Sequence, residues 1–230
     1  KSEAVDWSAM HAEEGWYVTA YMRNTFVWLL MDEQGRVQAY DFDLLGNASL
    51  TYDGAKFYSV ASFPHMKERC LIVNGFSKTY AMTGWRLGYV TGPAKLMPVL
   101  VKHHQYVTTS ITTFIQEGAA EAMNLPETMK DVEAMHDEFA RRRKLMMEGL
   151  DRIPKLSYVA PHGAFYIMVD VSKTGMTGEE FAEKLLYEKY VATVPAICLG
   201  SHCGDFVRFS FAADEEKIRE GLKRMEEFLK

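Results

Sequence analysis

The sequence lacks a hydrophobic run that could cross a bilayer. Near its start the longest apolar run covers six residues, 26–31, whereas a spanning helix needs about 20. Nor does any succession of basic, apolar and small residues mark a secretory signal. The sequence therefore predicts neither a membrane protein nor a secreted one.

Cysteine is scarce as well. The three cysteines, Cys70, Cys198 and Cys203, cannot all pair within one chain, and 14 methionines suit a reduced interior. We therefore expect a cytoplasmic protein. Because the chain begins at Lys1 without an initiator methionine, we expect its true start to be trimmed or to lie elsewhere.

The chain has no excess of positive charge. Its 26 Lys and Arg stand against 31 Asp and Glu, and the net charge of −5 disfavours nucleic acid as the main partner. Hydrophobic residues at 48% and charged residues at 25% are typical of a globular protein and exclude general disorder. A length of 230 residues allows one large domain or two small ones.

Hydrophobic patterning predicts a mixed α/β or α+β chain without internal repeats. In residues 1–45, which carry no motif, we expect strands at 15–22 and 25–32 and a turn at 32–35 into 36–42. Farther on, the pattern predicts strands at 69–74, 87–91, 156–159, 164–171, 191–194 and 205–211, and helices at 93–104, 111–123, 177–189 and 214–229, with a long amphipathic helix after residue 126. The eleven residues 75–85 leave little room for a helical crossover between the strands expected at 69–74 and 87–91. We therefore expect these two strands to pair antiparallel, and we expect the first of them to be buried.

The residues that carry chemistry concentrate at 74–89, NGFSKTYAMTGWRLGY. Lys78 follows a predicted buried strand, and burial beside the cation of Arg86 would disfavour its ammonium form. Arg86 and the hydroxyls of Ser77, Thr79 and Thr83 suit an anion, most naturally a phosphate. A lysine amine beside a phosphate site is what pyridoxal phosphate requires. By residue types alone, a solvated surface turn is the commoner outcome.

The order of these residues is more specific than their types. Residues 77–88, SKTYAMTGWRLG, closely resemble the lysine segment of class I/II pyridoxal-phosphate aminotransferases, the fold-type I group. Further resembling stretches follow the family's order: YDG at 52–54, YSVASFP at 58–64, QEGAA at 116–120, RRR at 141–143, PHGAFY at 161–166 and FVRFSFA at 206–212. The resemblance covers roughly residues 50–230.

The resemblance implies a role for each matching residue. Lys78 would carry pyridoxal 5'-phosphate as an internal aldimine, Arg86 with Ser77 would bind the cofactor, and Arg208 would bind the substrate carboxylate. The implied reaction moves an amino group between an amino acid and a 2-oxo acid. The resembled enzymes are homodimers, so we expect a homodimer without nucleic-acid or membrane partners.

The resemblance also implies a fold and a division into domains. We expect an α/β chain: part of a fold-type I large domain, a mixed sheet with helices, followed by an α+β small C-terminal domain. The expected division is an unassigned segment at 1–45, a partial cofactor-binding large domain at 46–120 and the small domain at 121–230.

Departures from the family pattern keep two alternatives open. Family members are usually much longer, and the Asn-Pro-x-Gly and Asp-x-x-Tyr motifs that contact the cofactor ring are absent here. Asp43 lies at about the right distance for the missing aspartate, but no tyrosine follows three residues on. In the loop 194–200, Ala196 and Leu199 also depart from the family. The alternatives are a different reaction of the same cofactor, such as a lyase, and a truncated, impaired remnant that acts as a structural or interaction module.

The remaining polar clusters have plain structural interpretations. Cys198, His202 and Cys203 lack a second pair of ligands, so we expect no metal site. His103 and His104 face different sides of a predicted helix and should be solvated.

Charged residues in two predicted helices need no catalytic role either. The run 141–144 should form a solvated helix face, and Glu179 and Glu180 suit a helix N-terminus. For Trp85 we expect core packing.

Overall fold

The computed structural model describes the backbone of four strands within residues 6–41 and, with side chains, residues 50–55, 59, 63–66 and 68–230. The chain divides into two compact units. The first comprises residues 1–49 and 56–132, and the second comprises residues 50–55 and 133–230. The expected division at residues 45 and 120 stays a prediction. No helix among the described residues is long and apolar enough to cross a bilayer.

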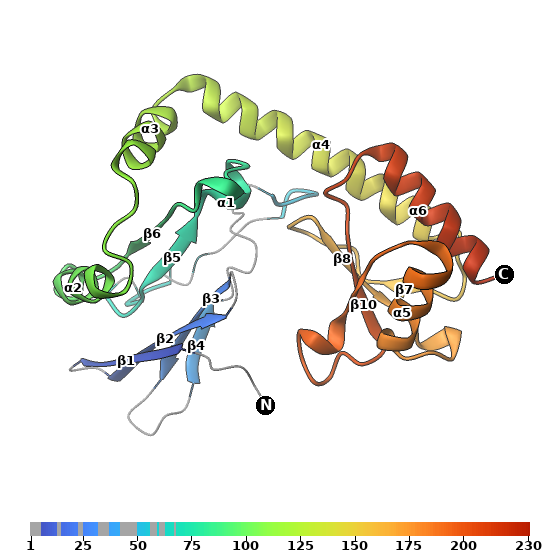
Figure 1. Ribbon diagram of the computed structural model, residues 1–230, viewed down its shortest axis with the longest axis horizontal. Coiled ribbons are helices and arrows are strands. Elements are labelled where there is room, and N and C mark those ends of the chain that lie inside the picture. The colour runs from blue at the N-terminus through green and yellow to red at the C-terminus, as the bar shows by residue number, and fades with distance from the viewer. Residues whose placement is uncertain are drawn as a thin grey trace. The chain divides into compact units, whose positions relative to one another are not determined.

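The first unit opens with an antiparallel sheet whose strands follow chain order: β1 (Asp6–Ala12), β2 (Gly15–Met22), β3 (Thr25–Met31) and β4 (Val37–Asp41) (Figure 1). β2, β3 and β4 confirm the strands expected there, whereas β1 was not expected. The expected turn at 32–35 and Asp43 lie outside the described residues.

A two-stranded hairpin carries the lysine segment of the first unit. β5 (Ile72–Gly75) pairs antiparallel with β6 (Gly88–Thr91), which confirms the expected pairing. Between them lie the one-turn helix α1 (Phe76–Thr79) and the 3₁₀ turn η2 (Thr83–Trp85). The expectation of a buried first strand is wrong for this chain: β5 is half-buried and β6 is exposed. A sheet of two strands has too little area to bury both of its faces.

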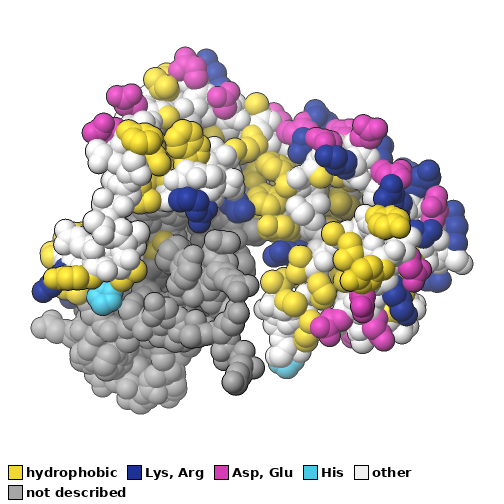
Figure 2. Space-filling model, in the orientation of Figure 1, with side chains coloured by type: hydrophobic (Ala, Val, Ile, Leu, Met, Phe, Trp, Pro, Cys, Tyr) yellow, Lys and Arg dark blue, Asp and Glu magenta, His cyan; other side chains and the backbone are white. Residues whose placement is uncertain are grey.

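Two helices complete the first unit, α2 (Met97–Val107) and α3 (Thr113–Met123). Both confirm expected helices, although α2 begins four residues late because Pro98 occupies its first turn. Figure 2 shows hydrophobic side chains on the surface of this region. The exposed large apolar side chains of α2 and α3 include Tyr106, 84% exposed, and Phe114, 69% exposed. Such exposure of large apolar side chains usually marks a surface that another segment or molecule covers.

The second unit is an antiparallel sheet with helices packed on one face. Its strand order is β7 (Ser157–Tyr158), β8 (Tyr166–Asp170), β10 (Phe206–Ser210) and β9 (Val194–Pro195). The helices are α4 (Pro126–Leu150) from residue 133 onward, α5 (Gly178–Lys189) and α6 (Glu215–Phe228). The expected strand at 191–194 is therefore shifted toward the C-terminus and shares only Val194 with β9.

Strand alternation separates the two faces of this sheet. Ile167, Val169, Val207 and Phe209 point into one core with apolar residues of all three helices. The other face carries Tyr166, Met168, Arg208 and Ser210, none of which is fully buried. The unit thus has a dry face that stabilises it and an open face that bears polar groups.

Of the helices α5 and α6, only α5 begins with a side-chain cap. Thr177 and Glu180 form a reciprocal capping box at the start of α5, which explains this glutamate without a catalytic role. Asp214 occupies the N-cap position of α6 as expected, but its side chain makes no capping bond. Its carboxylate instead lies 3.2 Å from the Lys217 amine.

Candidate active site

Lys78 lies on α1, directly after β5, and is half-buried. The carbonyl of Lys78 accepts a hydrogen bond from the Ala81 amide, and the Phe76 amide donates to the carbonyl of Leu87 across the hairpin. Gly88 permits this closure, because a Cβ atom there would lie 2.9 Å from the carbonyl oxygen of Asn74. The close approach of β5 and β6 thus holds the lysine turn in place.

Arg86 ends the same connection and is exposed. Its backbone is left-handed, with φ of 55°, as is that of Ala81, with φ of 53°. This conformation is uncommon for residues other than glycine and indicates a closely specified turn. The guanidinium Nη1 donates a 2.8 Å hydrogen bond to the carbonyl of Thr83. Ser77, Lys78 and Arg86 thus all lie on the connection between β5 and β6, and their roles stay a prediction.

Arg208 belongs to the second unit, on the open face of β10. Its Cζ atom lies over the ring of Tyr166 at 4.3 Å from the centroid. Among the described residues, no hydrogen bond or ion pair to this half-buried guanidinium is found. Sequence reasoning identified Arg208 but not Tyr166, although strand alternation places both on one face.

A second arginine, Arg143, is the one buried charged residue among those described, 7% exposed. Its Nη2 donates to Asp53 Oδ2 at 2.6 Å and its Nε to the carbonyl of Pro161 at 2.7 Å. Its Cζ atom lies 4.9 Å from the ring centroid of Tyr52. The expectation of a solvated face at 141–144 is thus wrong for Arg143, and its spacing could have shown this. Positions 139, 143 and 146 form one helical stripe, whose other two members are apolar.

This arginine ties residues 50–55 into the second unit. The Tyr52 hydroxyl donates to the carbonyl of Ala164 at 2.6 Å, and its ring stacks on His136 at 5.6 Å. The hydrogen bond from Arg143 holds the pKa of Asp53 below its ordinary value, while burial raises the pKa of Tyr52. A cavity of about 410 Å³ lies beside this cluster. The cluster is chiefly structural, since its polar groups bond one another.

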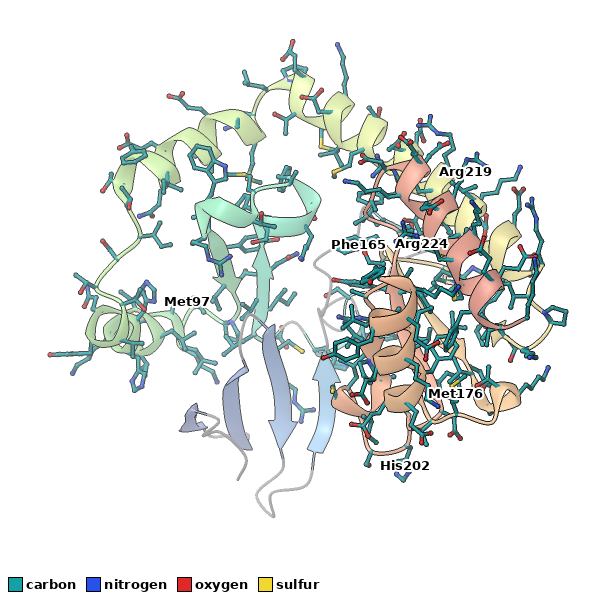
Figure 3. All side chains as sticks on the ribbon, turned by 45° about the vertical axis from the view of Figure 1, so that its right-hand side comes forward. Met97, Phe165, Met176, His202, Arg219 and Arg224 are labelled. Carbon is teal, nitrogen blue, oxygen red and sulfur yellow. The ribbon has the colours of Figure 1, made fainter. Side chains whose placement is uncertain are left out.

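The other sequence expectations have mixed outcomes. Among the described residues, no group of three His, Cys, Asp or Glu side chains could hold a metal ion. His202 lies on the loop before β10 (Figure 3), and the neighbouring Cys198 is exposed. His103 and His104 are exposed, as expected. The expectation of core packing is wrong for Trp85, which is 51% exposed, because it lies on the exposed connection to β6.

Comparison with known proteins places this arrangement in a family. The family model "Aminotransferase class I and II" matches residues 48–225, a range that includes Lys78, Arg86 and Arg208. The chain belongs to this family. Its α/β architecture is that of part of a fold-type I aminotransferase, which confirms the expected fold class.

Individual class I/II aminotransferases match over the same part of the chain. An aspartate aminotransferase of Pyrococcus abyssi is 45% identical over 179 residues, 78% of this chain and 46% of that protein. An aromatic-amino-acid aminotransferase of Thermococcus litoralis is 42% identical with the same coverage. The crystal structure of an aromatic aminotransferase from Pyrococcus horikoshii matches with a TM-score of 0.75 at 45% identity, covering 78% of this chain and 48% of that one. The chain spans about half the length of the curated relatives it matches.

Proposed function

We propose that this chain provides the lysine-bearing and carboxylate-binding parts of a pyridoxal-phosphate-dependent aminotransferase. The reaction would move an amino group between an amino acid and a 2-oxo acid. The observation that carries the proposal is the connection between β5 and β6, which presents half-buried Lys78 and exposed Arg86 within the matched range. The names of the similar aspartate and aromatic aminotransferases support the same reaction class.

The donor groups of this connection suit pyridoxal 5'-phosphate. Arg86 gives one of its five N–H donors to Thr83, and a guanidinium forks well onto a phosphate. Lys78 supplies a primary amine, the group that condenses with an aldehyde. The Ser77 hydroxyl lies next to it in the chain and can donate to the same anion. When bound, the cofactor supplies an electron sink for negative charge at the substrate Cα.

Each residue of this chain then has a defined task. Arg86 and Ser77 bind the phosphate and orient the cofactor toward Lys78. Lys78 would hold the cofactor covalently, and its Nζ would be the base that accepts the proton lost by the substrate Cα. Arg208 binds the α-carboxylate with its N–H donors, since none of them has a partner among the described residues.

The test of this proposal is the absorbance of the purified chain after addition of pyridoxal phosphate. We expect a band of a lysine-bound cofactor that Lys78→Ala abolishes. Lys95→Ala is the matched control, because Lys95 is exposed in the same unit and the band should survive there. Borohydride treatment followed by peptide mapping should find the cofactor mass on Lys78. A band of equal size in Lys78→Ala, with the mass on another lysine, would contradict the proposal.

The complete enzyme is further proposed to be a cytoplasmic homodimer, with residues 46–120 in its large domain and 121–230 in its small domain. The exposed apolar side chains of α2 and α3 support an additional interface. Sedimentation should find a dimer at micromolar concentration, and a monomer would contradict this part. The same exposed side chains favour the alternative of an interaction module. Absence of any cofactor band in the wild-type chain would favour that alternative.

A further inference from the structure

The guanidinium of Arg208 lies over the face of an aromatic ring. It lies 4.3 Å from the Tyr166 ring centroid, within the range of a cation–π contact. In the part of the chain that the structure describes, it has no carboxylate or carbonyl partner. An arginine held by a ring is fixed through its charge and flat face, so its in-plane N–H groups stay available.

The ring beneath Arg208 is itself supported by other rings. The ring centroids of Tyr166 and Phe165 lie 4.6 Å apart. The ring of Phe165 stacks on that of Phe139 of α4, with 5.5 Å between the centroids and an angle of 22° between the planes. Figure 3 labels Phe165 beside the start of β8. Phe165 is 8% exposed and belongs to the hydrophobic core of the unit. The aromatic series therefore connects the open face of the sheet to its rigid interior.

The strand register keeps Tyr166 and Arg208 in contact. Arg208 is opposite Met168 in the antiparallel pair of β10 and β8, and Tyr166 is opposite Ser210. Tyr166 is thus the diagonal neighbour of Arg208 on the same face, a spacing that aromatic and long side chains bridge. Val194 of β9 is opposite Arg208 on the other side, so no charged residue pairs with Arg208 directly across either strand.

We propose that Tyr166 is a positioning residue that orients Arg208 for a carboxylate ligand. This proposal deepens the proposed function and rests on the assignment of Arg208 as the carboxylate anchor. An acidic partner could also orient the guanidinium, but it would compete with the incoming carboxylate and reduce the local positive charge. The ring of Tyr166 orders the cation while leaving both its charge and its donors to the ligand.

Arginine-labelled NMR of the purified chain tests this role, with pyruvate as the carboxylate probe. The Arg208 Nε–H resonance, assigned by its loss in Arg208→Lys, should be shifted by the ring current of Tyr166 and should move when pyruvate is added. Tyr166→Leu should remove the ring-current shift and weaken pyruvate binding about 5- to 30-fold, the equivalent of a cation–π contact. Tyr166→Phe should retain both, because the ring and not the hydroxyl makes the contact.

Control and contrary outcomes are distinct. The control Tyr187→Leu, which alters a 71% exposed tyrosine of the same unit, should change neither the Arg208 Nε–H resonance nor the pyruvate affinity. Unchanged pyruvate affinity in Tyr166→Leu, or no response of Arg208 to pyruvate in the wild-type chain, would overturn the positioning role. The cofactor band on Lys78 is measured separately. Its absence beside a normal Arg208 response would count against the aminotransferase proposal and leave the positioning role of Tyr166 standing.

Discussion

Replacement of Arg143 by alanine should destabilise the second unit, whereas replacement of Arg141 should not. Both arginines lie on α4, two residues apart, and both bond acidic side chains. Arg143 is 7% exposed as a residue, while the Arg141 side chain is 65% exposed. The comparison therefore isolates the effect of burial on one side-chain type within one helix.

The expected loss follows from the contacts of Arg143. Without it the carbonyl of Pro161 loses its donor, which costs about 1–3 kcal/mol if the group stays buried. The contact with the Tyr52 ring adds about 1–2 kcal/mol, since that ring is only 2% exposed. The Asp53 side chain is 58% exposed, so its carboxylate returns to water at little cost. The sum is about 2–5 kcal/mol, whereas the solvent-exposed ion pairs of Arg141 should contribute little to stability.

Hydrogen exchange measured by mass spectrometry is the suitable assay. All four tryptophans, at positions 7, 16, 28 and 85, belong to the first unit, so tryptophan fluorescence does not report on the second. Peptides from β8 and β10 do report on it. At about 1.4 kcal/mol per factor of ten, Arg143→Ala should accelerate their exchange about 30-fold or more.

Two results would refute this reasoning. One is an acceleration in Arg143→Ala no larger than that in Arg141→Ala. The other is full protection in Arg143→Met, which keeps an apolar stem but removes the donors. The second result would mean that packing, and not the polar contacts, holds residues 50–55 in the unit.

Three further predictions use other parts of the chain. Arg86→Ala should weaken pyridoxal phosphate affinity by about 2 kcal/mol, roughly 30-fold by titration. Arg86→Lys should restore only part of this affinity, because a lysine amine cannot make two parallel hydrogen bonds to the phosphate. Unchanged affinity of Arg86→Ala at low ionic strength would contradict the phosphate role of Arg86. Gly178→Ala should lower the free energy of unfolding in urea by about 1–3 kcal/mol, since its Cβ would lie 2.3 Å from a backbone oxygen of β10. In the control Gly221→Ala the new Cβ would meet no atom within 4 Å, and the free energy of unfolding should rise by up to about 1 kcal/mol. Burial, with a hydrogen bond to Asp151, raises the pKa of Tyr158 to about 12, so the protonated hydroxyl stabilises the fold fully below about pH 10 and loses this contribution between about pH 10 and 12. Tyr158→Phe should remove this part of the alkaline loss of stability. An equal loss of stability between pH 10 and 12 in both proteins would contradict the role of Tyr158.

The lysine segment could be interpreted from sequence because its function depends on neighbours in the chain. Ser77, Lys78 and Arg86 occupy one connection of a short hairpin, so their order and spacing already determine that they lie near one another. The capping box of α5 was equally readable, since its partners are three residues apart. The predictions of a buried strand at 69–74 and of core packing for Trp85 were wrong, because burial depends on what covers a residue and not on its own type.

By itself the sequence determined most of the helices and strands and the candidate lysine, which depend on residues close along the chain, and the order of its motifs indicated the family. Only the tertiary structure decided that residues 50–55 pack with residues 133–230, that Arg143 is buried and that Tyr166 lies beneath Arg208. Tyr166 and Arg208 are 42 positions apart in the sequence, and Arg143 is 90 positions from Asp53. Local periodicity can place a side chain on a face of its own strand or helix, but the packing of the whole unit selects its partner across that face.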